Sequence, residues 1–220
     1  MKRPALSVKF LWLTLFTILM MLHGGPAVAA TDAEALYREH CASCHKENRL
    51  GADGPALLPQ NLTRLRKDAA ANVIANGSVA TQMPGFGGKL SKEEIDALVA
   101  LIYTPLPEVP AWGADEIEAS RIETANVPQT EVPMFEADPL NLFVVVETGD
   151  HHVTILNGDT FEPIHRFQSR FALHGGPKFT ADGRYVFFVS RDGWVTKFDL
   201  YTLTVTAEVR AGINSRNLAM

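Results

Sequence analysis

Five consecutive residues, Cys41-Ala42-Ser43-Cys44-His45, constrain this chain more than any other feature. The C-x-x-C-H spacing is the attachment signature of a c-type haem, in which both thiols bond to the porphyrin and the histidine turns onto the iron. A C-x-x-C pair alone also occurs in thioredoxin-like redox centres and as half of a zinc site. The chain has only two cysteines, so no second pair completes a zinc site. The motif predicts covalent haem c at Cys41 and Cys44, with His45 as an iron ligand.

The first thirty residues have the pattern of an export signal. Three basic residues precede an apolar run at 10–22, and small residues follow at 27–30. The apolar run is shorter than the roughly 20 residues that a membrane-spanning helix needs, so a cleaved leader is favoured over a retained anchor. We expect a signal peptide over residues 1–30. Because bacteria attach haem c outside the cytoplasm, we expect a periplasmic mature protein with no membrane attachment after cleavage.

The charge of the chain excludes one class of partner. The formal net charge is −5 at pH 7, and cleavage of the leader removes three basic residues and no acidic ones. Binding to nucleic acid needs clustered Lys and Arg, which an acidic mature protein lacks. We therefore expect no nucleic-acid partner. With both cysteines bonded to haem, none is left for a disulfide.

Residues 31–104 have the layout of a small helical domain. We expect a helix over 32–40 with Thr31 as its N-cap, and a loop over 49–61 that wraps the porphyrin edge. A second helix is expected over 68–76, closed by Gly77, and a third opens at the Ser91–Glu94 capping box. This order of helix, C-x-x-C-H, loop and two further helices resembles the class I cytochrome c family.

Met83, in the loop Met83-Pro84-Gly85-Phe86-Gly87, is the candidate sixth ligand of the iron. No other methionine lies between Cys44 and Ser91. A thioether opposite histidine raises the reduction potential and closes the iron to other ligands, as suits an electron carrier. The alternative is a methionine that packs against the porphyrin without ligating it. His40 is expected to be an exposed helix residue rather than a ligand.

The rest of the chain divides into two segments of different sequence pattern. Residues 105–139 are punctuated by proline and read as an interdomain linker, in which 115–123 suits one helical stretch. Residues 140–220 show short apolar runs separated by turn signals. The expected strands are 142–146, 153–156, 164–167, 177–179, 185–190, 194–199 and 204–210.

These strands form two repeats, and the offset between them matches the ~40–45 residues of a propeller blade. A propeller closes with about four to eight blades, whereas this chain supplies about two. The predicted fold is therefore α + β and multidomain: an all-α class I cytochrome c domain followed by the first blades of a β-propeller, expected to have eight blades when complete. We interpret the chain as the N-terminal piece of a longer protein or a truncated gene product.

A leader, a cytochrome c domain and the start of a propeller together resemble the cytochrome cd1 family. In the second domain the resemblance rests on Asn141-Leu142-Phe143-Val144-Val145, His174-Gly175-Gly176-Pro177-Lys178-Phe179 and Asp182-Gly183-Arg184-Tyr185-Val186-Phe187, followed by Arg191-Asp192-Gly193. The resemblance implies that His174 ligates the iron of a haem d1 and that Arg191 binds carboxylates of the macrocycle. Arg216 is a further candidate for such a carboxylate.

Taken without the family, these residues have ordinary interpretations. A histidine beside glycines is usually a solvated turn residue, and Arg191 would be a routine turn charge. We expect His151, His152 and His165 to be surface residues. The nitrite reductases of the family carry an arginine where this chain has Glu147-Thr148, so the resemblance favours the branch of the dihydro-haem d1 dehydrogenase.

Two classes of function follow. The first is a two-cofactor oxidoreductase that handles haem d1 or dihydro-haem d1 and passes electrons through haem c, as a dihydro-haem d1 dehydrogenase or, alternatively, as a cytochrome cd1 nitrite reductase. The second is a simple electron-carrier cytochrome. Small cytochromes or cupredoxins of the periplasm are the expected partners, and the resemblance also allows association with other denitrification proteins. Further active-site residues are expected beyond Met220.

Overall fold

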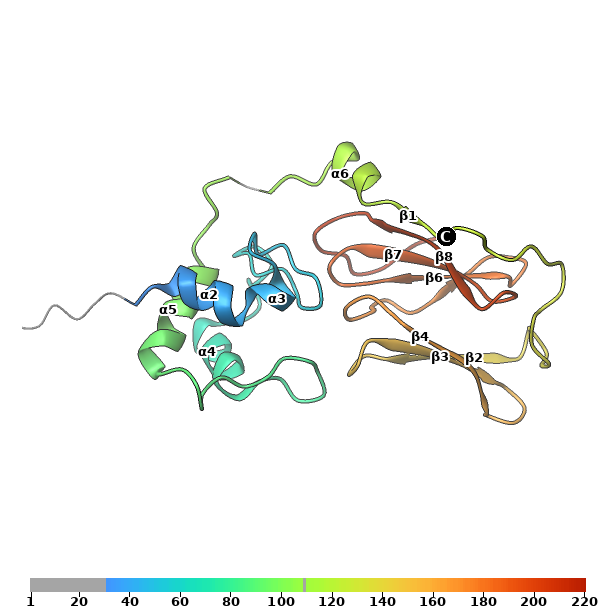
Figure 1. The fold of residues 1–220 in the computed structure, drawn as a ribbon, viewed down its shortest axis with the longest axis horizontal. Helices are drawn as coiled ribbons and strands as arrows, with labels where there is room; N and C mark the ends of the chain where they lie inside the picture. Colours follow the sequence, from blue (N-terminus) through green and yellow to red (C-terminus); the bar gives the residue numbers. More distant parts are fainter. Residues whose placement is uncertain (1–30, 109) are drawn as a thin grey trace, which may run out of the picture. The chain divides into compact units, whose positions relative to one another are not determined.

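The computed structural model describes residues 31–108 and 110–220, so the predicted signal peptide lies outside the described residues (Figure 1). Among the described residues, no helix has both the length and the apolar character needed to cross a membrane.

Four helices make up the first part: α2 (Ala33–His40), α3 (Ala42–His45), α4 (Lys67–Asn76) and α5 (Lys92–Ile102). Asp32, rather than the predicted Thr31, caps α2, because its carboxylate accepts a hydrogen bond from the amide of Ala35 at 3.0 Å. The Ser91–Glu94 capping box is confirmed in both directions. Gly77 ends α4 with a φ of 77°, as predicted.

The helices share one apolar core, and a buried arginine closes its edge. Tyr37 of α2, Ile74 of α4 and Leu98 of α5 are among the buried members. Arg49, only 5% exposed, donates hydrogen bonds to the carbonyl oxygens of Leu101 (2.6 Å) and Thr104 (3.0 Å). A cation suits carbonyl oxygens at the C-terminal end of α5, because the helix dipole is negative there. The loop after the C-x-x-C-H motif is thereby fastened to the last helix.

The segment predicted as a linker carries two short elements, α6 (Ala114–Ala119) and β1 (Ile122–Glu123). The helix is shorter than the predicted stretch 115–123 because its last residues pair as a strand instead. Ile122 lies opposite Glu208, and Glu123 lies opposite Ala207, both in β8. This pairing joins residues far apart in the sequence, so no local pattern indicates it.

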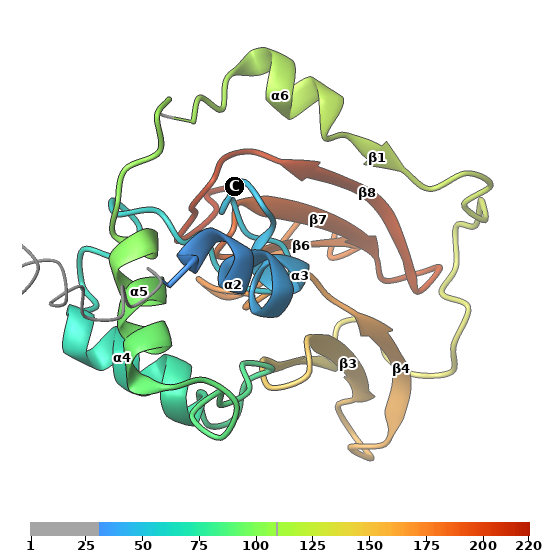
Figure 2. The same ribbon diagram turned by 60° about the vertical axis from the view of Figure 1, so that its left-hand side comes forward.

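The β part forms two antiparallel sheets (Figures 1 and 2). One has the order β2-β3-β4, and the other has the order β1-β8-β7-β6-β5. The strands are β2 (Leu142–Glu147), β3 (His152–Asn157), β4 (Pro163–Gln168), β5 (Lys178–Phe179), β6 (Tyr185–Val189), β7 (Trp194–Asp199) and β8 (Thr204–Arg210). All seven predicted strands are present, with ends within one residue of their predicted positions. The mixed α and β character of the fold is therefore confirmed.

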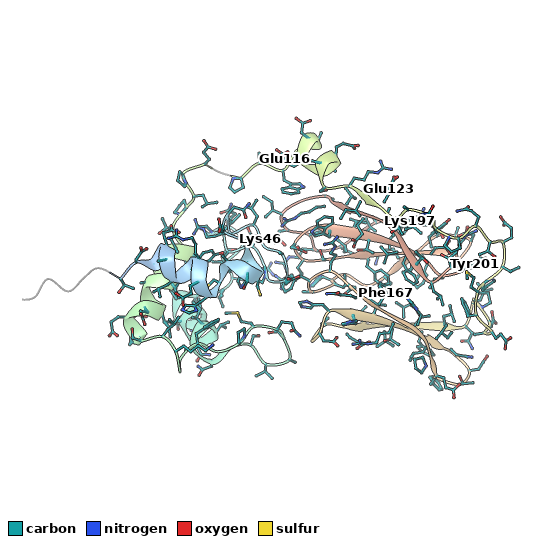
Figure 3. All side chains as sticks on the ribbon, in the orientation of Figure 1. Lys46, Glu116, Glu123, Phe167, Lys197 and Tyr201 are labelled. Carbon is teal, nitrogen blue, oxygen red and sulfur yellow. The ribbon has the colours of Figure 1, made fainter. Side chains whose placement is uncertain are left out.

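The two sheets bury one apolar cluster, which includes Val153 and Ile155 of β3 and Val186 and Phe188 of β6. Phe167 of β4 stacks on Phe198 of β7 with ring centroids 4.3 Å apart, and Figure 3 shows Phe167 between the sheets. Alternation along each strand, the period of a half-buried sheet, produces this cluster.

The predicted surface position of one histidine is wrong. His151 is 9% exposed and packs edge-on against Phe171, with ring centroids 5.5 Å apart. His165 is half-buried, with its ring centroid 6.0 Å from those of both Phe167 and Phe198. Histidine packs as an aromatic ring as well as acting as a polar group, and the partners Phe171 of His151 and Phe198 of His165 are distant in the sequence.

Candidate haem sites

The short helix α3 presents the C-x-x-C-H motif as one turn. Cys41 ends α2 and begins α3, and its carbonyl accepts the amide hydrogen bond of His45 at 3.0 Å. Both thiols are free and half-buried. Burial, assisted by the nearby Cys44, raises the pKa of Cys41 to about 11. Both sulfurs and the imidazole therefore come from one turn of helix, as the spacing predicts.

His45 is held in the tautomer that a metal ligand needs. It is 6% exposed, and its Nδ1 lies 2.8 Å from the carbonyl oxygen of Pro55. A carbonyl can only accept, so Nδ1–H donates and the lone pair of Nε2 remains for iron. Burial lowers the pKa of His45, which favours the neutral imidazole.

Gly54 makes this arrangement sterically possible. A Cβ at Gly54 would lie 2.7 Å from Cε1 and 2.9 Å from Nδ1 of the His45 ring. The backbone thus runs directly against the imidazole, and only glycine fits there. The sequence predicts that Gly54 lies in the loop that wraps the porphyrin, but it does not predict the close contact with the His45 ring. Its position just before Pro55 was the available signal.

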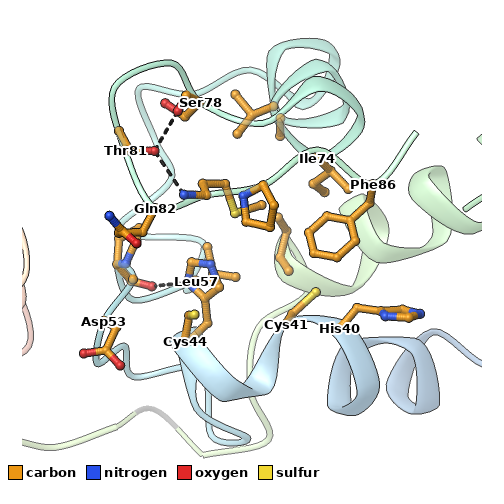
Figure 4. Close-up of a pocket in the computed structure, with 18 of the residues that line it drawn as sticks. His40, Cys41, Cys44, Asp53, Leu57, Ile74, Ser78, Thr81, Gln82 and Phe86 are labelled. Atoms are coloured by element: carbon orange, nitrogen blue, oxygen red, sulfur yellow. Dashed lines mark hydrogen bonds between the residues drawn. The ribbon is translucent and has the colours of Figure 1, made fainter. Parts of the chain in front are cut away.

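One cavity of about 340 Å³ brings the predicted haem c residues together. Cys41, Cys44, His45 and Met83 all line it, and Figure 4 shows the two cysteines facing Leu57, Ile74 and Phe86. The other lining residues of the helical part are mainly apolar, among them Leu62, Leu65, Ala70, Val73, Leu98 and Ile102. Two thiols, an imidazole and a thioether around an apolar cavity fit a covalently bound haem.

Met83 is half-buried in a loop fixed at both ends against α4. Its carbonyl accepts the amide hydrogen bond of Ser78, and its amide donates to the hydroxyl of Thr81, both at 3.1 Å. A Cβ at Gly77 would lie 2.7 Å from the Met83 carbonyl oxygen, and one at Gly85 would lie 2.8 Å from the backbone of Asn76. The thioether is therefore carried by an ordered loop at the cavity wall, and its ligation of iron stays a prediction.

His40, predicted as exposed, is half-buried instead. Its side chain is 21% exposed, and its ring lies 5.8 Å from that of Phe86, centroid to centroid. It lines the same cavity as the C-x-x-C-H motif. The correction follows from the position of the residue at the end of α2, which packs against the methionine loop.

The second candidate site gathers His174, Arg191 and Arg216 through the backbone. The amide of His174 donates to the carbonyl of Val189 at 2.8 Å, and the amide of Arg191 donates to that of Ala172 at 3.2 Å. Nδ1 of His174 lies 2.8 Å from the carbonyl oxygen of Arg216. The structure thus brings together three residues that span more than forty positions of the chain.

This site has the chemistry of an anion and metal site. Because Nδ1–H of His174 donates to a carbonyl, Nε2 is available to a metal ion, as in His45. In the described part of the chain, neither Arg191 nor Arg216 forms a salt bridge. Burial lowers the pKa of Arg191, and the charge of Arg216 adds to this effect. Two uncompensated guanidinium groups beside an imidazole fit a macrocycle that carries carboxylates.

Two glycines after His174 have positive φ angles, 82° at Gly175 and 74° at Gly176. A Cβ at Gly175 would lie 2.6 Å from the side-chain oxygen of Asn217 and 2.7 Å from the carbonyl oxygen of Arg216. Gly175 therefore permits close approach to the chain's own C-terminal segment. Gly176 faces open space, with no atom within 4 Å of an added Cβ.

Glu147, which lies where the family resemblance leads us to expect an arginine in a nitrite reductase, forms a polar cluster with Arg166 and Thr154. Its carboxylate accepts hydrogen bonds from Arg166 at 2.8 Å and from the hydroxyl of Thr154. Hydrogen bonds from these two groups lower the pKa of Glu147 to about 2. An ionised carboxylate repels anions, so this position offers no cation for an anionic substrate, as an arginine would.

Family models match two segments of the chain. The model described as "Cytochrome C oxidase, cbb3-type, subunit III" matches residues 28–102, and the "Cytochrome D1 heme domain" model matches residues 137–220. These matches confirm the predictions of a cytochrome c domain with haem c and of a d1-type haem domain after it.

Two curated proteins are similar to this chain over most of its length. A "Dihydro-heme d1 dehydrogenase" of Pseudomonas aeruginosa is 60% identical over 190 residues, which cover 85% of this chain and 38% of that protein. A "Nitrite reductase" of Stutzerimonas stutzeri is 26% identical over 98% of this chain and 42% of its own length.

A solved structure, "Dihydro-heme d1 dehydrogenase NirN in complex with DHE", superposes with a TM-score of 0.75 at 60% identity. The superposition covers 86% of this chain and 41% of that one. The chain spans about two fifths of the length of these relatives. The predicted resemblance to the cytochrome cd1 family is confirmed.

Proposed function

Because the chain joins a cytochrome c domain to a d1-type haem domain, as the cytochrome cd1 family does, we propose that it serves a dihydro-haem d1 dehydrogenase. In such a reaction one propionate side chain of the macrocycle becomes an acrylate, with loss of two protons and two electrons. Haem c supplies one-electron transfer when bound, which suits stepwise delivery of these electrons to an external carrier. Small cytochromes or cupredoxins of the periplasm are the proposed acceptors.

The geometry around His174 carries this proposal. His174 offers Nε2 to a metal, while Arg191 and Arg216 offer guanidinium groups that no acidic side chain of the described residues neutralises. Such a set binds a metallated macrocycle through its iron and its carboxylates at once. On this proposal, His174 orients the macrocycle and the two arginines hold its periphery.

We further propose that the two sheets are blades of a larger propeller. Each sheet contains a three-stranded antiparallel meander, and the equivalent strands β2 and β6 begin 43 residues apart, as the numbering of Leu142 and Tyr185 shows. The greater length of the relatives supports further blades in the complete protein. The segments 31–104, 105–139 and 140–220 are then haem c domain, linker and partial propeller, behind a leader at 1–30.

The nitrite reductase alternative rests on the Stutzerimonas stutzeri relative at 26% identity. Against it, Glu147 is paired with Arg166 where an arginine is expected in that branch. The two reactions also differ in the direction of electron flow: the dehydrogenase releases electrons, whereas the reductase consumes them to reduce nitrite to nitric oxide.

One experiment separates these functions. The holoprotein, produced from its native gene in a periplasm that attaches haem c, is mixed with dihydro-haem d1 and an oxidised carrier. We expect the red absorption band of haem d1 to grow while the carrier is reduced. Nitric oxide from nitrite and a reduced carrier would favour the reductase, and the absence of any d1-type band would leave a simple electron carrier.

A further inference from the structure

Arg210, the last residue of β8, is a buried cation for which the functions above have no use. It is 7% exposed. Its Nε donates to the carbonyl oxygen of Asp192 at 2.8 Å and to that of Gly212 at 3.2 Å. A guanidinium buried at this depth is costly unless its donors are satisfied. Its place in the fold therefore needs a specific reason.

The two carbonyls that Arg210 bridges belong to the segments that carry the candidate carboxylate ligands. Asp192 directly follows Arg191, and Gly212 begins the segment that leads to Arg216. Two further backbone bonds join these segments: Ala211 donates to Gly193 at 2.8 Å, and Ser215 donates to Arg191 at 3.1 Å. Arg210 is the side chain at the centre of this junction.

The linker holds Arg210 from the opposite side. The guanidinium lies 4.7 Å above the ring of Trp112, and the Trp112 indole N–H donates to the Arg210 carbonyl at 2.7 Å. The hydroxyl of Ser120, at the end of α6, accepts the Arg210 amide at 2.8 Å. Stacking on tryptophan stabilises a cation that is removed from water. The linker is thus docked on β8 at the residue that reaches the Arg191 turn.

We propose that Arg210 is a positioning residue that sets the relative placement of Arg191 and Arg216, with Trp112 as its support. The inference rests on the proposed function, since it is the carboxylates of a d1-type macrocycle that the two arginines bind. Arg210 itself touches no ligand. Its loss acts through Arg191, whose turn then keeps its backbone bonds and the hydrogen bonds that the Ser190 hydroxyl makes with Asp192 and Trp194, but loses its link to the Arg210 guanidinium.

A double-mutant cycle tests this proposal in the protein produced from its native gene. Arg210→Met, Arg191→Met and the double variant are titrated with haem d1, and binding is followed at its red absorption band. We expect Arg210→Met to weaken binding about tenfold, the scale of one charge-assisted hydrogen bond. In the Arg191→Met background the same change should weaken binding by less than about twofold. Arg210→Lys, which keeps a donor, should restore part of the affinity.

Arg184→Met is the matched control. Arg184 pairs with the buried Asp199 at 2.9 Å and lies at the other end of β6 from the Arg191 turn. Its loss should lower the melting temperature and leave the affinity of the folded protein for haem d1 unchanged. Equal affinity losses in Arg184→Met and Arg210→Met, or additive losses in the cycle, would overturn the proposal.

A measurement without ligand separates this inference from the proposed function. Amide hydrogen exchange at Ala211 and Ser215 should be faster in Arg210→Met than in the unmodified protein, while exchange within β3 stays the same. Unchanged exchange at both amides would overturn the positioning role whatever the ligand is. If the unmodified protein binds no haem d1 but exchange responds as expected, the proposed function fails and the role of Arg210 stands.

Discussion

His45 and His174 make the same hydrogen bond in two different surroundings. Each has Nδ1 at 2.8 Å from a backbone carbonyl, of Pro55 and of Arg216 respectively. His45 is 6% exposed in a cavity lined mainly by residues 37–102 of the helical part, whereas His174 is exposed beside two guanidinium groups. Both histidines therefore have the tautomer that leaves Nε2 available to a metal ion, but only His45 is enclosed by apolar side chains. The haem c site is therefore local, and the second site depends on long-range assembly.

The largest expected effect tests the local site. Replacing both Cys41 and Cys44 by alanine should abolish covalent haem, because no other cysteine exists in the chain. Mass spectrometry of the denatured protein should show one added haem in the unmodified chain and none in the variant. Extraction of haem from the unmodified protein into acidic organic solvent would contradict the assignment.

The equivalent test at the second site uses His174→Ala. Removing the imidazole takes away the proposed iron ligand but leaves Arg191 and Arg216, so we expect haem d1 binding to weaken about tenfold or more, with an altered spectrum. The haem c spectrum should stay the same, since His174 does not line the haem c cavity. His152→Ala, which removes a half-buried histidine of β3 in the other sheet, is the control. Unchanged binding and spectrum in His174→Ala would refute the ligand assignment.

Met83→Ala probes the other face of the haem c iron. Loss of the thioether should abolish the weak sulfur-to-iron charge-transfer band of the ferric protein in the near infrared and lower the reduction potential. Met134→Ala, an exposed methionine outside the helical part, should change neither. If the band survives in Met83→Ala, the residue only packs against the porphyrin.

Gly54→Ala tests how tightly the His45 ring is packed against the backbone. The new Cβ would press on the His45 ring at 2.7 Å, so the free energy of unfolding should fall by about 1–3 kcal/mol, the usual cost of overpacking. Gly88→Ala adds the same methyl group where no atom lies within 4 Å and should change stability by less than about 0.5 kcal/mol. Thermal unfolding of the two variants gives the comparison directly, and equal stabilities would mean that the loop moves away from the ring.

The sequence predicts the local site far better than the long-range one, for physical reasons. The capping box at Ser91 and the alternation of apolar residues in β2 and β3 involve residues that are close in the sequence. A local pattern therefore predicts them directly. The burial of His151 and the pairing of β1 with β8 depend on partners that no local pattern specifies. His174 and Arg191 could be proposed only through a family resemblance. The role of Arg210 had no signal in the sequence at all.

The smallest effect concerns Glu147, the residue on which the argument against the nitrite reductase alternative rests. Its pKa of about 2, held down by Arg166 and Thr154, lies below the usual 4.5. The unfolded chain therefore binds more protons between these values, so the stabilisation is complete above pH 4.5 and is lost as the pH falls toward 2. Glu147→Gln cannot titrate, so its melting temperature should fall less over this window than that of the unmodified protein. Glu162→Gln, which changes an exposed carboxylate without a salt bridge in the described part, should follow the unmodified curve. If Glu147→Gln also follows that curve, the Glu147–Arg166 pair is weak in solution, and the argument it supplies against the nitrite reductase alternative is lost.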